Sequence, residues 1–279
     1  MTRAALRVLV AGAGDLGTRI ARQLRARGHA VLSMARRERP GDADLIACDL
    51  TDPITTGLPE VDWLVHCLSP ATRDEPGYRA VYVDALRHLL AALSPSVRVA
   101  FVSSTAVHGD HAGAMVDEQT PCAPEGFNGR VLLEAEQVAR TRDHHALLLR
   151  LGGLYGPGRD ALLRRVMSGA PLAIGPPPLY TNRIDIDDAA GAIAHLVDID
   201  AHGVFHVVDN EPAAQPMVFD WIADALARPH LPRQHTPVTE PNRRVSNARL
   251  LATGYALQRP SFRDGYPAVI EAFRAGNAE

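Results

Sequence analysis

A glycine loop between a strand and a helix is the feature that most restricts the fold of this chain. The segment RVLVAGAGDLGTRIARQLRARGHAV begins as an apolar strand, passes through Gly12, Gly14 and Gly17, and leads through a helix into a second strand. In such a GxGxxG pattern the glycines allow a tight turn, close approach of a pyrophosphate, and close packing of helix on strand. Asp15 and Leu16 begin the helix, whose N-terminus would face the phosphates. The loop therefore predicts a dinucleotide site.

The rest of the chain alternates between strand-like and helical segments. Runs of Val, Leu, Ile and Ala that are typical of strands occur at 7–11, 30–35, 61–67, 97–103, 146–151 and 204–208. Helical stretches are expected at 15–27, 78–93, 130–141 and 187–198. Strands that are apolar on both faces and alternate with helices predict an α/β fold, a doubly wound parallel sheet covered on two sides.

The pattern becomes less regular in the last part of the chain. We expect residues 1–155 to form the dinucleotide-binding domain, and a later helix and strand within 182–208 to return to it. Segments 156–181 and 209–279 contain glycine- and proline-rich interruptions, which favour loops over regular elements. We expect these two segments to form a small substrate-binding cap at the carboxyl edge of the sheet.

The end of the second strand indicates which dinucleotide binds. An NAD enzyme places a carboxylate about 20 residues after the last glycine, where it holds the ribose 2′-hydroxyl. In this window the strand AVLSMARRE has Ala35, Arg36 and Arg37, and no acid before Glu38. Guanidinium groups pair bidentately with phosphate, so the two arginines favour NADP over NAD. A solvated basic turn is the alternative interpretation.

Composition excludes several classes of protein. All 29 basic residues are arginine, which excludes Schiff-base chemistry and a lysine-bearing phosphate loop. The net charge of −3 and the mixing of charges give no basic patch for nucleic acid or an anionic membrane. The 3 cysteines form no CxxC, and no apolar run approaches the ~20 residues of a membrane span. The first strand leaves no room for a cleavable signal, so we expect a cytoplasmic protein.

Several segments together resemble one known family. They run from GAGDLG through CDLTDP, YRAVYVDALRHLL, FVSSTAVHGD, LRLGGLYGPGR and NRIDIDDAAGAI to FHVVDNEP. In this combination the chain resembles the extended short-chain dehydrogenase/reductases, also called the NAD-dependent epimerase/dehydratase family. The resemblance implies an NAD(P)-binding Rossmann domain followed by a small C-terminal substrate domain.

The resemblance also implies positions along the cofactor. Asp49 and Leu50 would lie at the adenine, and Cys67 and Leu68 would line the cofactor. Ser103, beside the serine expected to be catalytic, is assigned to the cofactor side as well.

The acid–base pair of the family is missing. The family expects YxxxK on the helix that follows, but NGRVLLEAE places Asn128 at the tyrosine and Leu132 at the lysine. A shifted alignment cannot restore the motif, because the chain contains no lysine. In the family the tyrosine relays a proton while the lysine lowers its pKa, and asparagine cannot act as such an acid. The chain is therefore identified as an atypical branch without the usual proton donor.

Three residues are candidates for the catalytic role. By the resemblance, Ser104 is the catalytic hydroxyl, and Tyr155 with Gly156 flanks the nicotinamide. His108 stands where the SSxxVYG pattern has tyrosine, and an imidazole titrates near neutral pH. Tyr155 has a plainer interpretation as a packing residue and His108 as a polar loop residue. No metal is expected, because His108 and His111 lack a third ligand at convincing spacing.

Two functions compete on these observations. The first is an NADP-dependent oxidoreductase or epimerase that acts on a small carbonyl or sugar-nucleotide-like substrate through a substitute acid. The alternative is a non-catalytic NADP-binding sensor or scaffold. Another nucleotide enzyme of the Rossmann type is disfavoured by the motifs after residue 100. A small molecule is the expected partner, and both a homodimer through helices 78–93 and 130–141 and a monomer are compatible with the sequence.

Overall fold

The computed structural model describes residues 4–39, 41–55, 57–236 and 239–276. The chain forms two compact units. The first comprises Met1–Val107, Pro124–Arg150 and Ala190–Phe205, and the second comprises His108–Ala123, Leu151–Ala189 and His206–Glu279. Compared with the predicted domains, segments 108–123, 151–155, 182–189 and 206–208 fall in the second unit.

The first unit is built around a seven-stranded sheet with the strand order β12-β7-β5-β4-β1-β2-β3. Its strands are β1 (Arg7–Ala11), β2 (Ala30–Ala35), β3 (Leu45–Ala47), β4 (Trp63–His66), β5 (Arg98–Ser104), β7 (Leu147–Leu151) and β12 (Gly203–Val207), of which the last two end in the second unit. Its helices are α1 (Asp15–Ala26), α2 (Glu75–Tyr78), the π-helix η1 (Arg79–Asp84), α3 (Ala85–Ala92), the 3-10 turn η2 (Thr105–His108), α4 (Phe127–Arg142) and most of α6 (Ile186–Asp198).

The central strands form because they are apolar on both faces. β1 has the sequence RVLVA and is buried from its second residue on, and all four residues of β4 are buried. β1 pairs in parallel with β2 on one side and β4 on the other, so Leu9 lies between Leu32 and Leu64. Such a sheet is stable only when helices cover both of its faces.

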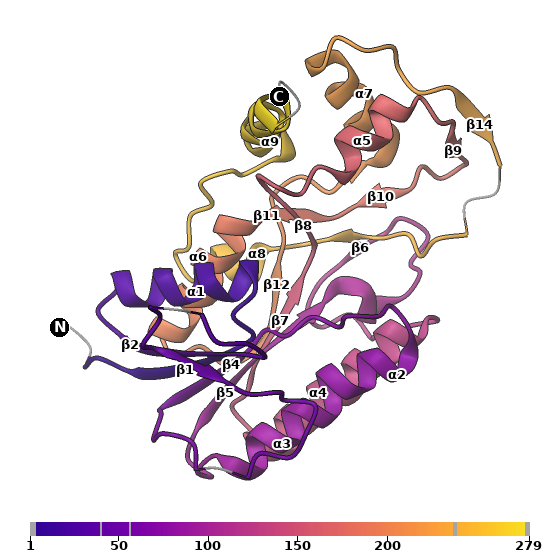
Figure 1. Ribbon diagram of the computed structural model, residues 1–279. Coiled ribbons are helices and arrows are strands. Elements are labelled where there is room, and N and C mark those ends of the chain that lie inside the picture. The colour runs from indigo at the N-terminus through magenta and orange to yellow at the C-terminus, as the bar shows by residue number, and fades with distance from the viewer. Residues whose placement is uncertain (1–3, 40, 56, 237–238, 277–279) are drawn as a thin grey trace. The chain divides into compact units, whose positions relative to one another are not determined.

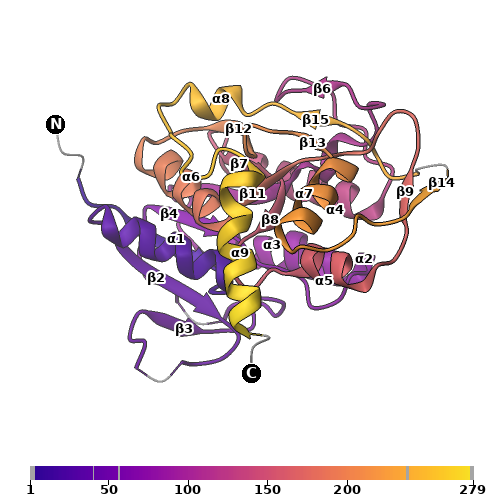
Figure 2. The ribbon, with the colours of Figure 1, turned by 90° about the horizontal axis from the view of Figure 1, so that it is seen from above.

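Helices cover the sheet as this rule requires. In Figure 1, α1 lies on one face, and α3 and α4 lie on the other. The inward residues of α1 are Gly17, Ile20, Ala21 and Leu24, which share one face of a helix with 3.6 residues per turn. Seen from above in Figure 2, β2 and β3 lie at one edge of the sheet, beside α1. β1 ends at Ala11, and the glycine loop begins at the next residue, Gly12.

The second unit has small two-stranded sheets and its own apolar core. Its elements are β6 (Met115–Val116), β8 (Gly153–Tyr155), α5 (Ala161–Ser168), β9 (Leu172–Ile174), β10 (Tyr180–Thr181), β11 (Arg183–Asp185), β13 (Ala213–Ala214), α7 (Gln215–Ala225), β14 (Arg233–His235), β15 (Arg244–Val245), α8 (Ala248–Leu251) and α9 (Phe262–Gly276). Its core includes Leu163, Phe219, Ile222, Phe262 and Tyr266.

The predicted fold class is confirmed: the described residues form a doubly wound parallel sheet of the Rossmann type. The expected helix over 78–93 is part of a longer helical region, α2, η1 and α3, that contains a π-turn. The sequence reading did not predict β3 or the short strands of the second unit. Elements of two or three residues are too short to show a period-2 pattern.

Candidate functional site

The glycine loop adopts a backbone that only glycine fits at two of its three positions. Gly12 has a φ of +111°, and a Cβ there would lie 2.9 Å from the carbonyl of Cys67 and from the backbone nitrogen of Leu68. A Cβ on Gly17 would lie 1.9 Å from the carbonyl oxygen of Gly12. These contacts bring β1, β4 and α1 together at the carboxyl edge of the sheet, as the motif predicts.

Gly14 is different, because its surroundings are open. A Cβ there would meet nothing within 4 Å, and the residue is exposed. Gly14 is also the N-cap of α1, and no side chain caps this helix end. Backbone N–H groups at an uncapped N-terminus, together with the helix dipole, favour an anion. The space above Gly14 and the start of α1 at Asp15 and Leu16 therefore fit the pyrophosphate of a dinucleotide.

The Cys67 side chain packs against the backbone of the glycine loop. Its thiol donates hydrogen bonds to the carbonyl oxygens of Ala11 at 3.4 Å and Gly12 at 3.3 Å. The side chain is buried, and burial raises the pKa of the Cys67 thiol to about 12. A thiol with so high a pKa is a poor nucleophile, so Cys67 serves the loop by packing.

A cavity of about 190 Å³ lies beside the loop, within the first unit. It is lined by Ala35, Arg36, Cys48, Asp49, Leu50, Thr51, Leu68, Ser69, Ala71, Thr72, Gly77, Ala80 and Val81. Asp49 accepts hydrogen bonds from the backbone N–H of Thr51 at 3.0 Å and from its hydroxyl at 2.7 Å. These bonds lower the pKa of Asp49 and keep it ionised. The resemblance assigns Asp49, Leu50 and Leu68 to the cofactor, and all three line this one cavity.

Three arginines follow β2 at the rim of this region. Arg36 lines the cavity, and both Arg36 and Arg37 are exposed. Neither guanidinium makes a hydrogen bond or an ion pair with any residue in the described ranges. Arg39 donates a hydrogen bond to the carbonyl oxygen of Ala13 in the glycine loop. Sequence reasoning missed Arg39, although it belongs to the same basic run, RRER, as the two arginines that were predicted.

A buried ion pair joins β5, α4 and β7 near the candidate catalytic strand. The Arg150 guanidinium donates to both carboxylate oxygens of Glu136, at 3.0 and 2.8 Å. Ser103 donates its hydroxyl proton to the same carboxylate at 2.7 Å. All three side chains are more than nine-tenths buried. Ser103 therefore holds the end of β5 in place from inside the protein, although the sequence assigned it to the cofactor.

Ser104 and the positions of the missing motif lie in the same unit. Ser104 is partly exposed, and its hydroxyl oxygen accepts a hydrogen bond from the backbone N–H of Ala106 at 3.2 Å. That bond leaves the hydroxyl proton available to a substrate oxygen. On α4, Asn128 is partly exposed in the first turn, and Leu132 is buried. An apolar side chain thus fills the buried position at which the resemblance predicts a lysine.

Tyr155 and His108 both lie in the second unit and are buried. The Tyr155 hydroxyl donates to the carbonyl oxygen of Ser261 at 3.3 Å, and its ring stacks on Tyr266 at 4.8 Å. Burial also raises the pKa of Tyr155. His108 lies with Nε2 2.8 Å from Nε2 of His206. Packing accounts for both side chains, and their catalytic roles remain predictions.

A second group of buried polar residues lies around the start of α6. The Asp185 carboxylate accepts a hydrogen bond from the backbone N–H of Asp187 at 2.8 Å, which caps the start of the helix. It also forms an ion pair with the Arg259 guanidinium at 3.0 Å. Arg183 and Asp209 are both more than nine-tenths buried, and each has one side-chain atom without a hydrogen-bond partner among the described residues. Burial lowers the pKa of Arg183 and raises that of Asp209 to about 7.

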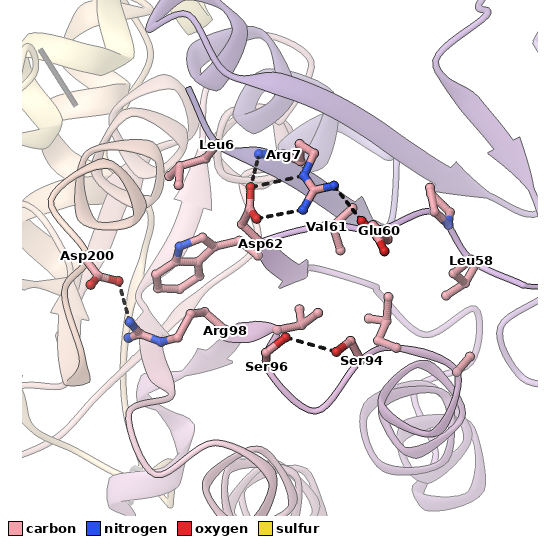
Figure 3. Close-up of a pocket in the computed structure, with 15 residues that line it drawn as sticks. Leu6, Arg7, Leu58, Glu60, Val61, Asp62, Ser94, Ser96, Arg98 and Asp200 are labelled. Atoms are coloured by element: carbon pink, nitrogen blue, oxygen red, sulfur yellow. Dashed lines mark hydrogen bonds and ion pairs between the residues drawn. The ribbon is translucent and has the colours of Figure 1, made fainter. Parts of the chain in front are cut away.

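A larger cavity, of about 720 Å³, lies at the opposite edge of the sheet (Figure 3). It is lined by Arg7, Trp63 and Arg98, the first residues of β1, β4 and β5. Its charged side chains are bound to one another: Arg7 pairs with Asp62 and Glu60, and Arg98 pairs with Asp200 and lies over Trp63. Ligands of open parallel sheets bind at the carboxyl ends of the strands, so this cavity is not the candidate site.

The described residues offer neither a metal site nor a membrane-spanning helix. They contain no group of three or more His, Cys, Asp or Glu side chains arranged to hold a metal ion. None of the helices within them combines the length and the apolar character needed to cross a membrane.

The fold, the glycine loop and the adjoining cavity together define a nucleotide-binding protein of the Rossmann type. The family model described as the NAD dependent epimerase/dehydratase family matches residues 8–204. The chain belongs to this NAD(P)-binding family, as its motifs predicted.

Several known proteins are similar to this one over nearly the whole length of the chain. A 3-diazoavenalumate denitrifying reductase from a Streptomyces species is 32% identical, over 93% of this chain and 99% of the relative. The solved structure of an NAD-dependent epimerase/dehydratase from Methylobacillus flagellatus is 32% identical with a TM-score of 0.80, over 97% of this chain and 100% of that one. The human epimerase family protein SDR39U1, solved with NADPH, is 25% identical with a TM-score of 0.76, over 98% and 100%.

Proposed function

We propose that the protein is an NADP-dependent reductase of a small carbonyl compound or a related electrophile. The observation that carries this proposal is the cradle formed by Gly12, Gly14 and Gly17 beside a cavity with Arg36 at its rim. Where an NAD enzyme needs a carboxylate after its second strand, this chain has Ala35 followed by Arg36 and Arg37. Both guanidinium groups are exposed, and neither makes a hydrogen bond or an ion pair with a described residue. A ribose 2′-phosphate is the anion that such groups bind bidentately.

The residues of the first unit fit a bound cofactor. The start of α1 would hold the pyrophosphate, Asp49 and Leu50 would hold the adenosine end, and Arg36 with Arg37 would hold the 2′-phosphate. When bound, the reduced nicotinamide supplies a hydride. Ser104, whose hydroxyl proton is free to donate, would hold the substrate oxygen.

Reduction is supported over epimerisation by what the chain lacks. An epimerase that works by transient oxidation must first remove a proton from a substrate hydroxyl, which requires a tyrosine whose pKa a cation has lowered. Leu132 removes that cation, and the chain has no lysine to replace it. Reduction needs only a proton donor. The Streptomyces relative is also named a reductase.

The test is a screen of NADPH oxidation over small aldehydes, ketones and sugar nucleotides, with Ser104→Ala as the variant. We expect at least one substrate to turn over, and Ser104→Ala to lower kcat while NADPH still binds. Binding of NADPH without oxidation by any substrate would contradict the proposal. It would favour the alternative, an NADP-binding sensor or scaffold, which the missing Tyr/Lys pair also allows.

A further inference from the structure

The position of the missing tyrosine raises the question of which other hydroxyl could act as the acid. The chain has 6 tyrosines, and of these only Tyr78 and Tyr82 belong to the unit that holds the glycine loop and Ser104. Both lie in the helical region before α3, Tyr78 at the end of α2 and Tyr82 within η1.

Ring contacts connect Tyr82 directly to β5, which carries Ser104, and through Tyr78 to α4, which carries Asn128. On one side its ring lies 5.3 Å from Tyr78, whose ring meets Phe127 edge-on at 5.4 Å. Phe127 begins α4 and directly precedes Asn128, the position of the lost tyrosine. On the other side Tyr82 meets Phe101 edge-on at 6.2 Å. Phe101 lies on β5, three residues before Ser104.

The backbone around Tyr82 is unusual. The segment Arg79–Asp84 is a π-helix, a widened turn that interrupts α-helices and is frequent at functional sites. Two hydrogen bonds from the Arg79 guanidinium to the carboxylate of Glu134, at 2.7 and 2.8 Å, tie this turn to α4. The turn is therefore held against the helix that begins at Phe127, and Tyr82 has a fixed position within it.

The Tyr82 hydroxyl is unused in the described part of the protein. It makes no hydrogen bond with any described residue, and the side chain is only partly buried. Burial raises the pKa of Tyr82 to about 12. His66, which packs against Phe101 at 5.2 Å, is neutral, since burial lowers its pKa to about 4. The phenol therefore carries its proton at neutral pH and cannot act as a base there, and the raised pKa makes it a weaker acid than an ordinary tyrosine.

We propose that Tyr82 is the proton donor of the reduction, in place of the tyrosine lost at Asn128. This inference rests on the proposed reductase function and names its acid. As the carbonyl carbon receives the hydride and its two electrons, the C=O π bond breaks, and the oxygen takes the proton from the Tyr82 hydroxyl oxygen. The product is an alcohol, and the Tyr82 phenolate recovers a proton from water.

The test compares Tyr82→Phe with Tyr78→Phe, a matched control that removes a hydroxyl from the same aromatic cluster. The substrate is the one found in the NADPH-oxidation screen. A general acid contributes about 10²–10⁴-fold to rate, so we expect Tyr82→Phe to lower kcat by that factor and Tyr78→Phe to leave it unchanged. NADPH affinity and circular dichroism should be the same in both variants and the wild type.

A second readout needs no turnover. With 3-fluorotyrosine placed at position 82, the fluorine resonance should differ between the complexes with NADP⁺ and NADPH, because only the oxidised nicotinamide is positively charged. With the same label at position 78 the two complexes should differ much less. 3-Fluorotyrosine retains the phenol and nearly the same volume as tyrosine, so the labelled protein should fold. This measurement therefore tests the role of Tyr82 even if Tyr82→Phe does not fold.

The outcomes separate this inference from the proposed function. Turnover that persists in a folded Tyr82→Phe at the wild-type rate would overturn the role of Tyr82 and leave the reductase function intact. A fluorine resonance at position 82 that is the same with NADP⁺ and NADPH would overturn it as well. If the wild type binds NADPH but oxidises it with no substrate, the reductase function fails, and the role of Tyr82 fails with it.

Discussion

Gly14 and Gly17 stand three residues apart, yet the structure gives them different roles. A side chain at Gly17 collides with the backbone of Gly12, whereas a side chain at Gly14 meets open space. Gly17 is thus required for the conformation of the loop itself, whereas Gly14 leaves open the space in which we propose that the pyrophosphate binds. The same motif spacing contains both requirements, and only the surroundings of each residue separate them.

This difference predicts opposite results for two alanine variants. Gly17→Ala should lower the melting temperature, because overpacking of this kind costs about 1–3 kcal/mol or more. Gly14→Ala should keep the melting temperature and lose NADPH affinity, since its methyl group would stand where the pyrophosphate approaches the backbone. Thermal unfolding and calorimetric titration of both variants test this, and equal NADPH affinity of Gly14→Ala and wild type would contradict it.

Asp209 makes stability depend on pH in a direction that can be tested. Burial raises its pKa from 3.8 to about 7, so between these values the folded protein binds more protons than the unfolded chain. Stability associated with this group is therefore present at low pH and is lost as pH rises to about 7. Asp209→Asn removes the ionisation, and at pH 8 it should stabilise the protein by at most about 4 kcal/mol.

The measurement is urea unfolding of wild type and Asp209→Asn at several pH values. The gain in unfolding free energy should shrink as pH falls from 8 toward 4. Asp185→Asn is not a suitable control, because Asp185 caps α6 and pairs with Arg259. Asp52 is a suitable control because it is exposed, and Asp52→Asn should change the unfolding free energy little at any of these pH values. A gain from Asp209→Asn that is constant across the range would contradict the assignment.

At the scale of elements, α4 is held in place by residues outside the predicted YxxxK positions, Asn128 and Leu132. Glu136 pairs with Arg150 from β7 and accepts the Ser103 hydroxyl from β5, so one carboxylate fixes the helix to two strands. Leu132, one turn earlier, is buried. The packing of the helix and its ion pair therefore hold it without a tyrosine at position 128 or a lysine at position 132.

Restoring the family lysine should be costly for this reason. Leu132→Lys would bury an ammonium group whose nearest buried carboxylate on the helix, Glu136, is already paired with Arg150. We expect a loss of about 3–5 kcal/mol in unfolding free energy, whereas Leu132→Met should cost less than about 1.5 kcal/mol. Urea unfolding of the two variants gives both values, and a stable Leu132→Lys would show that the site still accommodates a cation.

At the scale of the whole molecule, the sequence predicted the parts of the fold that have a strong pattern. The central strands have continuous apolar runs, and the loop at Gly12–Gly17 has fixed spacing, so both could be predicted. The role of Ser103 could not, because its partners Glu136 and Arg150 lie far away in the sequence. The sequence also offered no reason to single out Tyr82, because its contact with Phe101 on β5 exists only in the folded chain.

The central claim is that the loop and the arginines after β2 bind a 2′-phosphorylated dinucleotide. Calorimetric titration of the wild type, Arg36→Ala and the control Arg140→Ala with NADPH and NADH tests it most directly. Arg140 is an exposed arginine in the last turn of α4, outside the cavity. We predict that the wild type prefers NADPH, that Arg36→Ala loses about 1.5–3 kcal/mol for NADPH alone, and that Arg140→Ala changes nothing. Tighter binding of NADH by the wild type, or an Arg36→Ala that binds NADPH as well as the wild type does, would contradict the account.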